Sequence, residues 1–230
     1  MSTAAASAAH VSSKTSAGIR HFLLRRLHSL TGIVFGGYLV IHLIINATMI
    51  QGGNVFQNQV EKIHSLPFLH VIEWTFIYLP ILFHTVYGIW ITVTAQPNVL
   101  HYRYGKNIFY TLQRVSAIII VGFMFIHVLG MKGLLGATLA FDPHHSTASA
   151  ARHINASWWI AYLLYPVGVL ASTYHLANGF WTAAISWGLT ISKQAQRRWG
   201  VVCLFIFLMT FALGITAWVA ALMNKQLVVQ

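Results

Sequence analysis

Five long apolar stretches constrain this chain more than any other feature, and they lie near residues 24–49, 68–95, 109–131, 157–190 and 199–223. A helix needs roughly 20 apolar residues to cross a hydrocarbon core of about 30 Å, and each stretch is long enough. The runs are continuous rather than alternating, which favours helices over a transmembrane barrel. Because 57% of the 230 residues are hydrophobic and only 7% are charged, the sequence predicts an all-α membrane protein, a bundle of five transmembrane helices.

Lysine and arginine are unequally divided between the two sides of such a bundle. One side carries ten of them, namely Lys14, Arg20, Arg25, Arg26, Arg103, Lys106, Arg114, Lys193, Arg197 and Arg198. The other side carries four, namely Lys62, Lys132, Arg152 and Lys225. Because cytoplasmic loops are enriched in positive charge, we expect the N-terminus in the cytoplasm and the C-terminus outside. The net charge of +11 then reflects topology and attraction to anionic membrane lipid, and no nucleic-acid partner is expected, since the basic residues flank apolar helices.

The segments outside the spans are short. Residues 1–19 are rich in alanine and serine and are expected to form a disordered tail, followed by one membrane domain over residues 20–230. The tail does not resemble a cleavable signal peptide, because Arg25 and Arg26 lead directly into a full-length span. No loop is large enough for a soluble catalytic domain, and the sequence has no nucleotide-binding glycine motif and no iron–sulfur cysteine cluster. Chemistry is therefore expected within the membrane or on a partner.

Four histidines lie deep within the apolar stretches: His42, His84, His127 and His175. An ionisable side chain in the hydrocarbon layer is costly and marks a functional site, and imidazole is an axial ligand of haem iron. At a rise of about 1.5 Å per residue, His42 and His127 lie about 25 Å from the inner ends of their spans, near the outer face. His84 and His175 lie about 24–27 Å from the outer ends, near the inner face. These depths predict two pairs, His42 with His127 and His84 with His175, and hence two stacked haems.

Each inner histidine is followed four residues later by a glycine, His84 by Gly88 and His175 by Gly179. A residue without a side chain one helical turn away leaves room for a flat macrocycle, although such glycines also serve helix packing in membranes. Because Cys203 is the single cysteine and no Cys-x-x-Cys-His motif occurs, any haem is expected to be held non-covalently. The alternative role for the four histidines is a pore, a proton relay or polar contacts across the bundle.

A second pairing scheme involves His28 and His70, which each lie 14 residues before a proposed ligand. This spacing is close to four helical turns and also suits a helix that carries two haem ligands, as in quinol–cytochrome c reductase cytochromes. It would pair His28 with His84 and His42 with His70. We favour the first scheme because the second gives two of the deep histidines no role. The histidines in polar segments are expected to be solvated, namely His10, His144, His145 and His153.

Several short segments follow one another in a recognisable order: Arg25-Arg26-Leu27-His28-Ser29-Leu30-Thr31-Gly32, Ile41-His42-Leu43-Ile44-Ile45-Asn46, Ser65-Leu66-Pro67-Phe68, Leu79-Pro80 with His84-Thr85-Val86-Tyr87-Gly88, Leu112-Gln113-Arg114-Val115, His127-Val128, His175-Leu176-Ala177-Asn178-Gly179-Phe180-Trp181 and Trp187-Gly188-Leu189-Thr190. With these segments the chain resembles the succinate dehydrogenase cytochrome b558 subunits, which are one-chain, five-helix, di-haem membrane anchors of succinate:menaquinone oxidoreductases. The resemblance covers roughly residues 20–215.

The resemblance implies two haems b, an inner one on His84 and His175 and an outer one on His42 and His127. Two imidazoles on each iron leave no open position, so these haems would carry electrons rather than bind oxygen. In each ligand, the ring nitrogen that does not bind iron is expected to donate its hydrogen to a backbone carbonyl one helical turn earlier in the chain. The propionates near the inner face are expected to meet four residues, namely His28, Ser29, Gln113 and Arg114.

A quinone site needs a titratable group near a haem edge, because quinone chemistry moves protons with electrons. The chain has only three acidic residues, namely Glu61, Glu73 and Asp142. Glu73 lies about one turn inside the second span, level with the predicted outer haem, and is our candidate for proton exchange with a quinol. The alternative is a helix-start carboxylate stabilised by the helix dipole. Glu61 is a weaker candidate in a loop, and Asp142 is expected in a turn with Pro143.

The resemblance further implies a multi-pass subunit in the bacterial cytoplasmic membrane, bound to a flavoprotein and an iron–sulfur subunit that carry the dicarboxylate chemistry. Electrons from succinate would pass through the inner and then the outer haem to menaquinone, linking the tricarboxylic acid cycle to respiration. The redox alternatives are a fumarate reductase anchor working in reverse and the di-haem anchor of a nitrate reductase or hydrogenase. The alternatives outside redox chemistry are a transporter and a purely structural anchor.

Overall fold

The computed structural model describes residues 2–95 and 104–224, with side chains from residue 18, and this part of the chain is entirely helical. The helices are α1 (Ser2–Ala47), α2 (Gly53–His64), α3 (Leu69–Glu73), α4 (Leu79–Val93), α5 (Gly105–Met131), α6 (Ser146–Ile154), α7 (Tyr165–Ser186) and α8 (Lys193–Met223). Two π-helical segments, Trp74–Tyr78 and Ile160–Leu164, join α3 to α4 and precede α7. Short 3-10 turns cover Thr48–Gln51, Ala137–Leu139 and Pro143–His145.

Five helical segments of this structure are long and apolar enough to cross a membrane, namely Gly18–Gln51, Leu69–Val93, Gly105–Met131, Ile160–Ser186 and Lys193–Met223. They coincide with the five predicted spans, so the prediction of a five-helix, multi-pass membrane protein is confirmed. The structure continues α1 back to Ser2. The division into a tail and a membrane domain stays a prediction, as does the cytoplasmic placement of the N-terminus. Arg103 and Lys225 lie outside the described residues.

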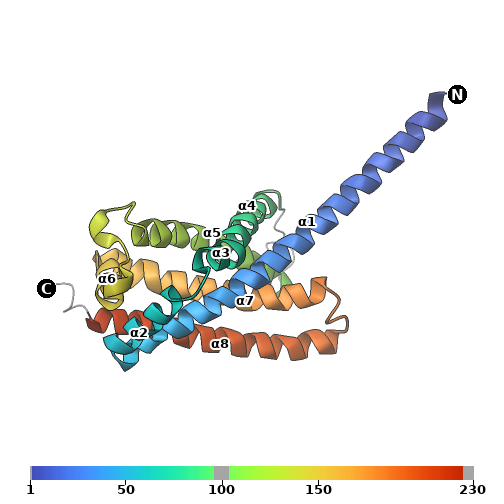
Figure 1. Cartoon of the computed structure of the whole chain (residues 1–230). Helices are drawn as coiled ribbons and strands as arrows, with labels where there is room; N and C mark the ends of the chain where they lie inside the picture. The colour runs from blue at the N-terminus through green and yellow to red at the C-terminus, as the bar shows by residue number, and fades with distance from the viewer. Residues whose placement is uncertain (1, 96–103, 225–230) are drawn as a thin grey trace.

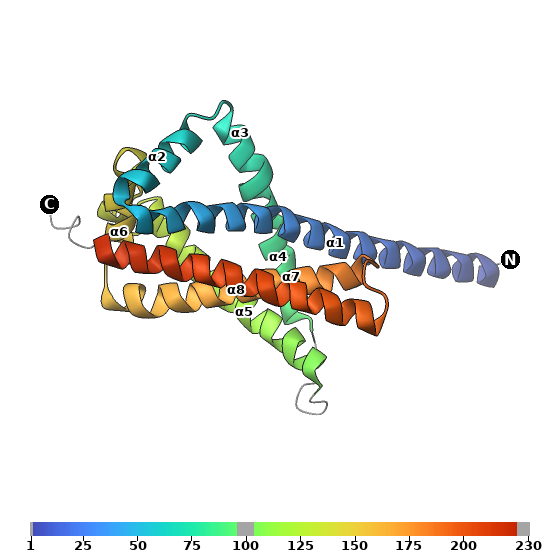
Figure 2. The ribbon, with the colours of Figure 1, turned by 90° about the horizontal axis from the view of Figure 1, so that it is seen from below.

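The long helices pack around two central elements, α1 and α7. Helix α7 lies along α8 and against α5, while α1 packs against α4 and α8 (Figures 1 and 2). Helices α3 and α4 cross α1 obliquely, and the N-terminal part of α1 projects beyond the other helices (Figure 2). The side chains of α1, α4, α5 and α7 can therefore meet within the bundle, and these are the four helices that carry the deep histidines.

Two of the spans widen into a π-helical turn immediately before a proline. The segment Trp74–Tyr78 precedes Pro80, and Ile160–Leu164 precedes Pro166. Proline has no N–H to donate to the carbonyl four residues back, and its ring crowds that carbonyl, so a wider turn relieves the clash. Both turns lie in the spans that carry His84 and His175. The sequence reasoning did not anticipate these turns, although the prolines were the signal for them.

A helical cap, formed by α2 and α6, covers the end of the bundle next to the C-terminus of α1 (Figure 1). Gln57 joins the two helices, because its Oε1 accepts hydrogen bonds from the backbone N and Oγ of Ser146 at 2.8 and 2.7 Å. Thr147 donates to the carbonyl of Gly53 at 2.8 Å. A buried apolar cluster that includes Phe56 and Ile154 lies beneath the cap. These segments, expected to be loops, thus contain packed helices.

The contact between α5 and α7 requires a glycine, and this yields the first prediction. A Cβ at Gly168 would lie 2.4 Å from Cδ2 of Phe123, whose ring is buried. We expect Gly168→Ala to lower the free energy of unfolding by about 1–3 kcal/mol, as overpacking does. The measurement is thermal unfolding of the detergent-purified protein, followed by circular dichroism. Gly37→Ala is the control, because a Cβ there meets nothing within 4 Å, and equal effects of both changes would contradict the prediction.

Candidate functional site

The inner pair of histidines is brought together within the bundle. The ring centroids of His84 on α4 and His175 on α7 lie 6.2 Å apart, at an interplanar angle of 87°. Nδ1 of His84 lies 2.9 Å from the carbonyl oxygen of His28, and Nδ1 of His175 lies 3.1 Å from that of Gln113. A carbonyl only accepts, so Nδ1 of each ring carries the hydrogen and donates it. Nε2 of each ring is left with a lone pair that can bind a metal ion.

The carbonyl partners of this pair correct one prediction. They were expected one turn back on the same helix, but His28 lies on α1 and Gln113 lies on α5, so each ring reaches a neighbouring helix. These carbonyls belong to helices yet can accept a second hydrogen bond, because a carbonyl oxygen has two lone pairs. Which helices are neighbours is a property of the tertiary fold, and the spacing along one span does not reveal it.

The outer pair is held by side chains instead of carbonyls. The rings of His42 on α1 and His127 on α5 have centroids 6.1 Å apart, at 80°. Nδ1 of His127 lies 2.9 Å from the hydroxyl of Tyr165, and Nδ1 of His42 lies 3.5 Å from that of Tyr38 and 3.4 Å from Nδ2 of Asn46. Here too the expectation of a carbonyl one turn back was wrong. A hydroxyl both donates and accepts, so Tyr38 and Tyr165 orient the rings without selecting one tautomer. The Nδ2 group of Asn46 only donates, and its shorter hydrogen bond is to the carbonyl of His42 at 2.7 Å.

The spacing of both pairs fits one metal ion between two rings. An imidazole nitrogen bound at about 2.0 Å places the ring centre about 3 Å from the ion, so two opposed rings lie about 6 Å apart. The observed separations are 6.2 and 6.1 Å. Among the described residues, no group of three or more His, Cys, Asp or Glu gathers that could hold a metal ion. The geometry thus pairs two imidazoles at each of two levels.

The second pairing scheme is contradicted by the structure. The rings of His28 and His84 stack in parallel, with centroids 4.0 Å apart and an angle of 9°, which is too close for an ion between them. The side chain of His70 is 92% exposed and lies beside Glu73 instead of His42. Stacking on His84 also buries Nδ1 of His28, and this atom has no hydrogen-bond partner.

The residues expected around the inner haem are only partly gathered there. Gln113 donates from Nε2 to the carbonyl of His175 at 3.1 Å, whereas the Arg114 guanidinium lies over the ring of Tyr110. Ser29 accepts a hydrogen bond from Nε1 of Trp187 at 3.0 Å.

The glycines near the inner pair have different neighbours. A Cβ at Gly88 would lie 3.1 Å from Cε1 of His28, so the His28 imidazole packs against this glycine. A Cβ at Gly179 would meet Nε2 of Gln113 at 3.6 Å, an ordinary contact. Contact of either glycine with a cofactor stays a prediction. The sequence reasoning missed Gly32, where a Cβ would approach Cε1 of His84 to 2.5 Å, and its position four residues after His28 was the available signal.

His153 was expected to be solvated and is buried instead. It belongs to α6, one of the two helices of the cap, and only 1% of its surface is exposed. Its ring centroid lies 6.0 Å from that of His127 and 6.0 Å from that of Tyr165. Burial lowers the pKa of His153 below its ordinary value, and the nearby backbone of Leu139 opposes this in part. The signal in the sequence was a helical face of small residues at Ser146, Ser149 and Ala150 that continues to His153.

The other loop histidines behave as expected. His144 and His145 are exposed, and the side chain of His145 donates to Asp142 at 2.9 Å. Together with the backbone N–H of His144, this hydrogen bond lowers the pKa of Asp142. Asp142 thus stabilises the turn with Pro143, as predicted. The side chain of His10 lies outside the described part of the structure.

Glu73 opens onto a cavity of about 680 Å³ at the side of the bundle. The residues that line it are His70, Glu73, Trp74, Tyr78, Ile81, Leu82, Thr85 and Lys132. Oε2 of Glu73 lies 3.3 Å from Nδ1 of His70. The cavity therefore combines an apolar wall with a carboxylate that lies beside an imidazole.

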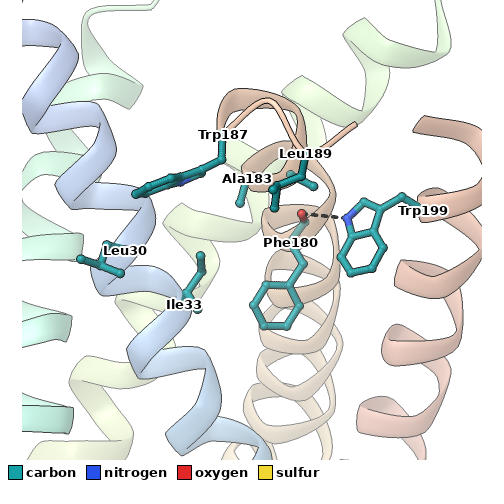
Figure 3. Close-up of a pocket in the computed structure, with 8 residues that line it drawn as sticks. Leu30, Ile33, Phe180, Ala183, Trp187, Leu189 and Trp199 are labelled. Atoms are coloured by element: carbon teal, nitrogen blue, oxygen red, sulfur yellow. Dashed lines mark hydrogen bonds between the residues drawn. The ribbon is translucent and has the colours of Figure 1, made fainter. Parts of the chain in front are cut away.

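A second, smaller cavity of about 310 Å³ lies between α1, α7 and α8, on the side of the bundle away from the helical cap. Leu30, Ile33, Phe180 and Trp187 line it, and Trp199 closes it by donating from Nε1 to the carbonyl of Phe180 at 3.1 Å (Figure 3). Its wall is almost wholly apolar. Such a surface suits a hydrocarbon tail and offers no group for proton or electron transfer.

Comparison with known proteins identifies a similar curated protein, named succinate dehydrogenase cytochrome b558 subunit, from Bacillus subtilis (strain 168). The two sequences are 35% identical over 203 residues, which is 87% of this chain and 96% of that protein. No family model matches the sequence. The similarity extends over nearly the whole of both chains.

Proposed function

The chain belongs to the family of succinate dehydrogenase cytochrome b558 subunits, and from this membership we propose that it anchors a succinate dehydrogenase in the bacterial cytoplasmic membrane and connects it to a quinone. The observation that carries the proposal is the pairing of four half-buried histidines at two levels of one bundle. In this proposal His84 and His175 hold an inner haem b, and His42 and His127 hold an outer haem b.

The residues present fit a haem at each level. A metal ion between two imidazoles needs its other ligands from the cofactor, and a porphyrin supplies them. The ring separations of 6.2 and 6.1 Å suit opposed axial ligands. Buried donors without partners lie beside each pair, namely Nδ1 of His28 and the hydroxyl of Tyr87 at the inner pair, and the ring of His153 at the outer pair.

Two haems, when bound, would supply one-electron carriers between a cytoplasmic iron–sulfur subunit and a quinone near the outer face. The chain's own residues orient these groups. His28 and Gln113 fix the inner rings through their carbonyls, which raises the basicity of the ligating nitrogens. Tyr38 and Tyr165 orient the outer rings through their hydroxyls. Of the four residues proposed for the inner propionates, His28 carries a buried ring nitrogen without a partner, whereas Ser29 and Gln113 already have protein partners. The Arg114 guanidinium lies over the ring of Tyr110.

The quinone site that we propose is the cavity beside Glu73. An oxygen of its carboxylate lies within hydrogen-bonding distance of Nδ1 of His70, whose side chain is exposed. In this proposal the two groups pass protons between the quinone and the aqueous phase. Trp74, Tyr78 and Leu82 provide an apolar wall for a quinone ring and tail. We propose menaquinone as the substrate and flavoprotein and iron–sulfur subunits as the partners that oxidise succinate.

Haem content tests the ligand assignment. We expect the purified complex to contain about two b haems per copy of this chain, because each iron needs two imidazoles. His84→Leu and His175→Leu should each remove one haem and leave the other, as measured by the pyridine haemochrome assay. His144→Leu is the control, since this side chain is exposed, and it should keep both. A complex that keeps both haems without His84 would refute the inner pair, and a colourless parent complex would refute the proposed function.

Glu73 is tested by separating the quinone reaction from electron entry. We expect Glu73→Gln to slow succinate-dependent reduction of a soluble menaquinone analogue by roughly 100-fold, the scale of lost acid–base catalysis. Reduction of the haems by succinate should remain as fast as in the parent complex. Glu61→Gln is the matched control, because Glu61 lies outside the cavity and accepts a hydrogen bond from Gln57. Parent-like quinone reduction in Glu73→Gln would remove Glu73 from the site.

The physiological direction has its own test. Transfer of an electron outward follows the membrane potential and gains about 2.3 kcal/mol for each 100 mV. We therefore expect an uncoupler to slow succinate oxidation by menaquinone in sealed vesicles and to leave fumarate reduction intact. Detergent-solubilised complex, which has no potential to lose, is the control. Equal inhibition of both directions would contradict outward transfer and favour the alternative of a fumarate reductase anchor.

A further inference from the structure

His153 is a buried imidazole that the proposed function does not use. It lies in α6 with 1% of its surface exposed, next to the ring of His127. Neither Nδ1 nor Nε2 has a hydrogen-bond partner of ordinary geometry. If the nearby backbone of Leu139 is counted as a partner for one nitrogen, the other nitrogen is still unpaired. A buried polar group without a partner costs about 1–3 kcal/mol, so this arrangement needs a reason.

The structure makes room for this ring specifically. A Cβ at Gly130 on α5 would lie 2.1 Å from Cε1 of His153, which is far inside any permitted contact. The imidazole thus fits against a helix at a position that has no side chain. Gly130 lies three residues after His127, so the helix that carries the outer ligand also makes room for the His153 ring.

Among the described residues, no acceptor of ordinary geometry meets this ring. The hydroxyl of Tyr165 is engaged with Nδ1 of His127 at 2.9 Å. The buried cluster beneath the helical cap is apolar and includes Phe123, Ile154 and Ile160. The residues that line the cavity beside Glu73 come from α3, α4, the π-helical segment between them and the end of α5, and none belongs to α6. A quinone in that cavity is therefore not the natural partner of His153.

We propose that His153 donates a hydrogen bond to a propionate carboxylate of the haem bound between His42 and His127. This inference rests on the proposed function, because it requires an outer haem. A haem carries two carboxylates that must leave water when the macrocycle is buried, and a carboxylate is a strong acceptor for an N–H donor. A haem propionate and a quinone carbonyl both offer an acceptor oxygen to an N–H donor. The experiment below distinguishes these two sources of the oxygen.

The experiment uses the assembled complex with His153→Leu, His153→Phe and His153→Gln. Leucine and phenylalanine fill the space without a nitrogen, and glutamine keeps an N–H donor. His144→Leu is the control, since His144 belongs to the same segment but is exposed. Haem content is measured first. About two haems per chain must be present in the parent complex, and a haem-free parent would count against the proposed function and not against His153 alone.

Redox titration then follows each haem by its spectrum, and the His84→Leu complex identifies the outer haem. Without the donor, the negative charge of the propionate is less compensated. This charge stabilises ferric iron relative to ferrous iron and so lowers the midpoint potential. We expect the outer midpoint potential to shift downward in the leucine and phenylalanine variants, to stay near the parent value in His153→Gln, and to be unchanged in His144→Leu. The inner potential should not move in any of these variants. An unchanged outer potential in the leucine or phenylalanine variant would overturn the proposal.

Infrared difference spectra identify the source of the acceptor oxygen. The haem is labelled with carbon-13 at the propionate carboxyl groups, and spectra are recorded between the reduced and oxidised complex. We expect the labelled carboxylate bands to shift in the leucine variant and to match the parent in the glutamine variant. A shift confined to quinone carbonyl bands would assign His153 to the quinone instead and would overturn the haem proposal. If the leucine variant does not assemble, the phenylalanine and glutamine variants decide the result.

Discussion

The arrangement of this protein depends on a constraint on each deep imidazole, which satisfies Nδ1 with a protein partner. In the proposed function, Nε2 is then left for haem iron. In an apolar medium an unpaired nitrogen is costly, so the partner of Nδ1 determines how the ring is oriented. At the inner level the partner is a carbonyl on a neighbouring helix, and at the outer level it is a hydroxyl or an amide. Each ligand therefore requires two helices, one to carry the ring and one to orient it.

This requirement explains the distribution of small residues and prolines in the bundle. Gly32 allows α1 to approach the ring of His84, and Gly168 allows α7 to approach Phe123, which stacks on His127 at 5.4 Å. The π-helical turns before Pro80 and Pro166 change the phase of the two helices that carry the inner ligands. The side-chain directions of His84 and His175 therefore depend on these turns, which a regular helix does not contain.

Depth and composition were predictable from the sequence, and contacts between helices were not. The five spans and the proximity of His42 to His127 and of His84 to His175 follow from apolar length and from helical rise, which are local properties. The partners of Nδ1 could not be read in this way, because the carbonyls of His28 and Gln113 lie 56 and 62 residues from the rings they hold. His153 was misjudged because its segment is polar overall, and its burial depends on contact of its ring with Gly130 and His127 on α5. The spacing of Ser146, Ser149 and Ala150 relative to His153 shows a helical face in retrospect.

The buried donors without partners are not scattered through the described part of the chain, and four of the five such atoms lie near an imidazole pair. Nδ1 of His28 and the hydroxyl of Tyr87 lie by the inner pair, and the two nitrogens of His153 lie by the outer pair. A protein rarely leaves such groups unsatisfied in an apolar interior, because each one subtracts from a small net stability. Their placement is explained if an anionic cofactor completes the hydrogen bonding at both levels. The same cofactor would then hold together helices that otherwise contact one another through imidazole rings, so cofactor binding and the stability of the bundle are expected to be linked.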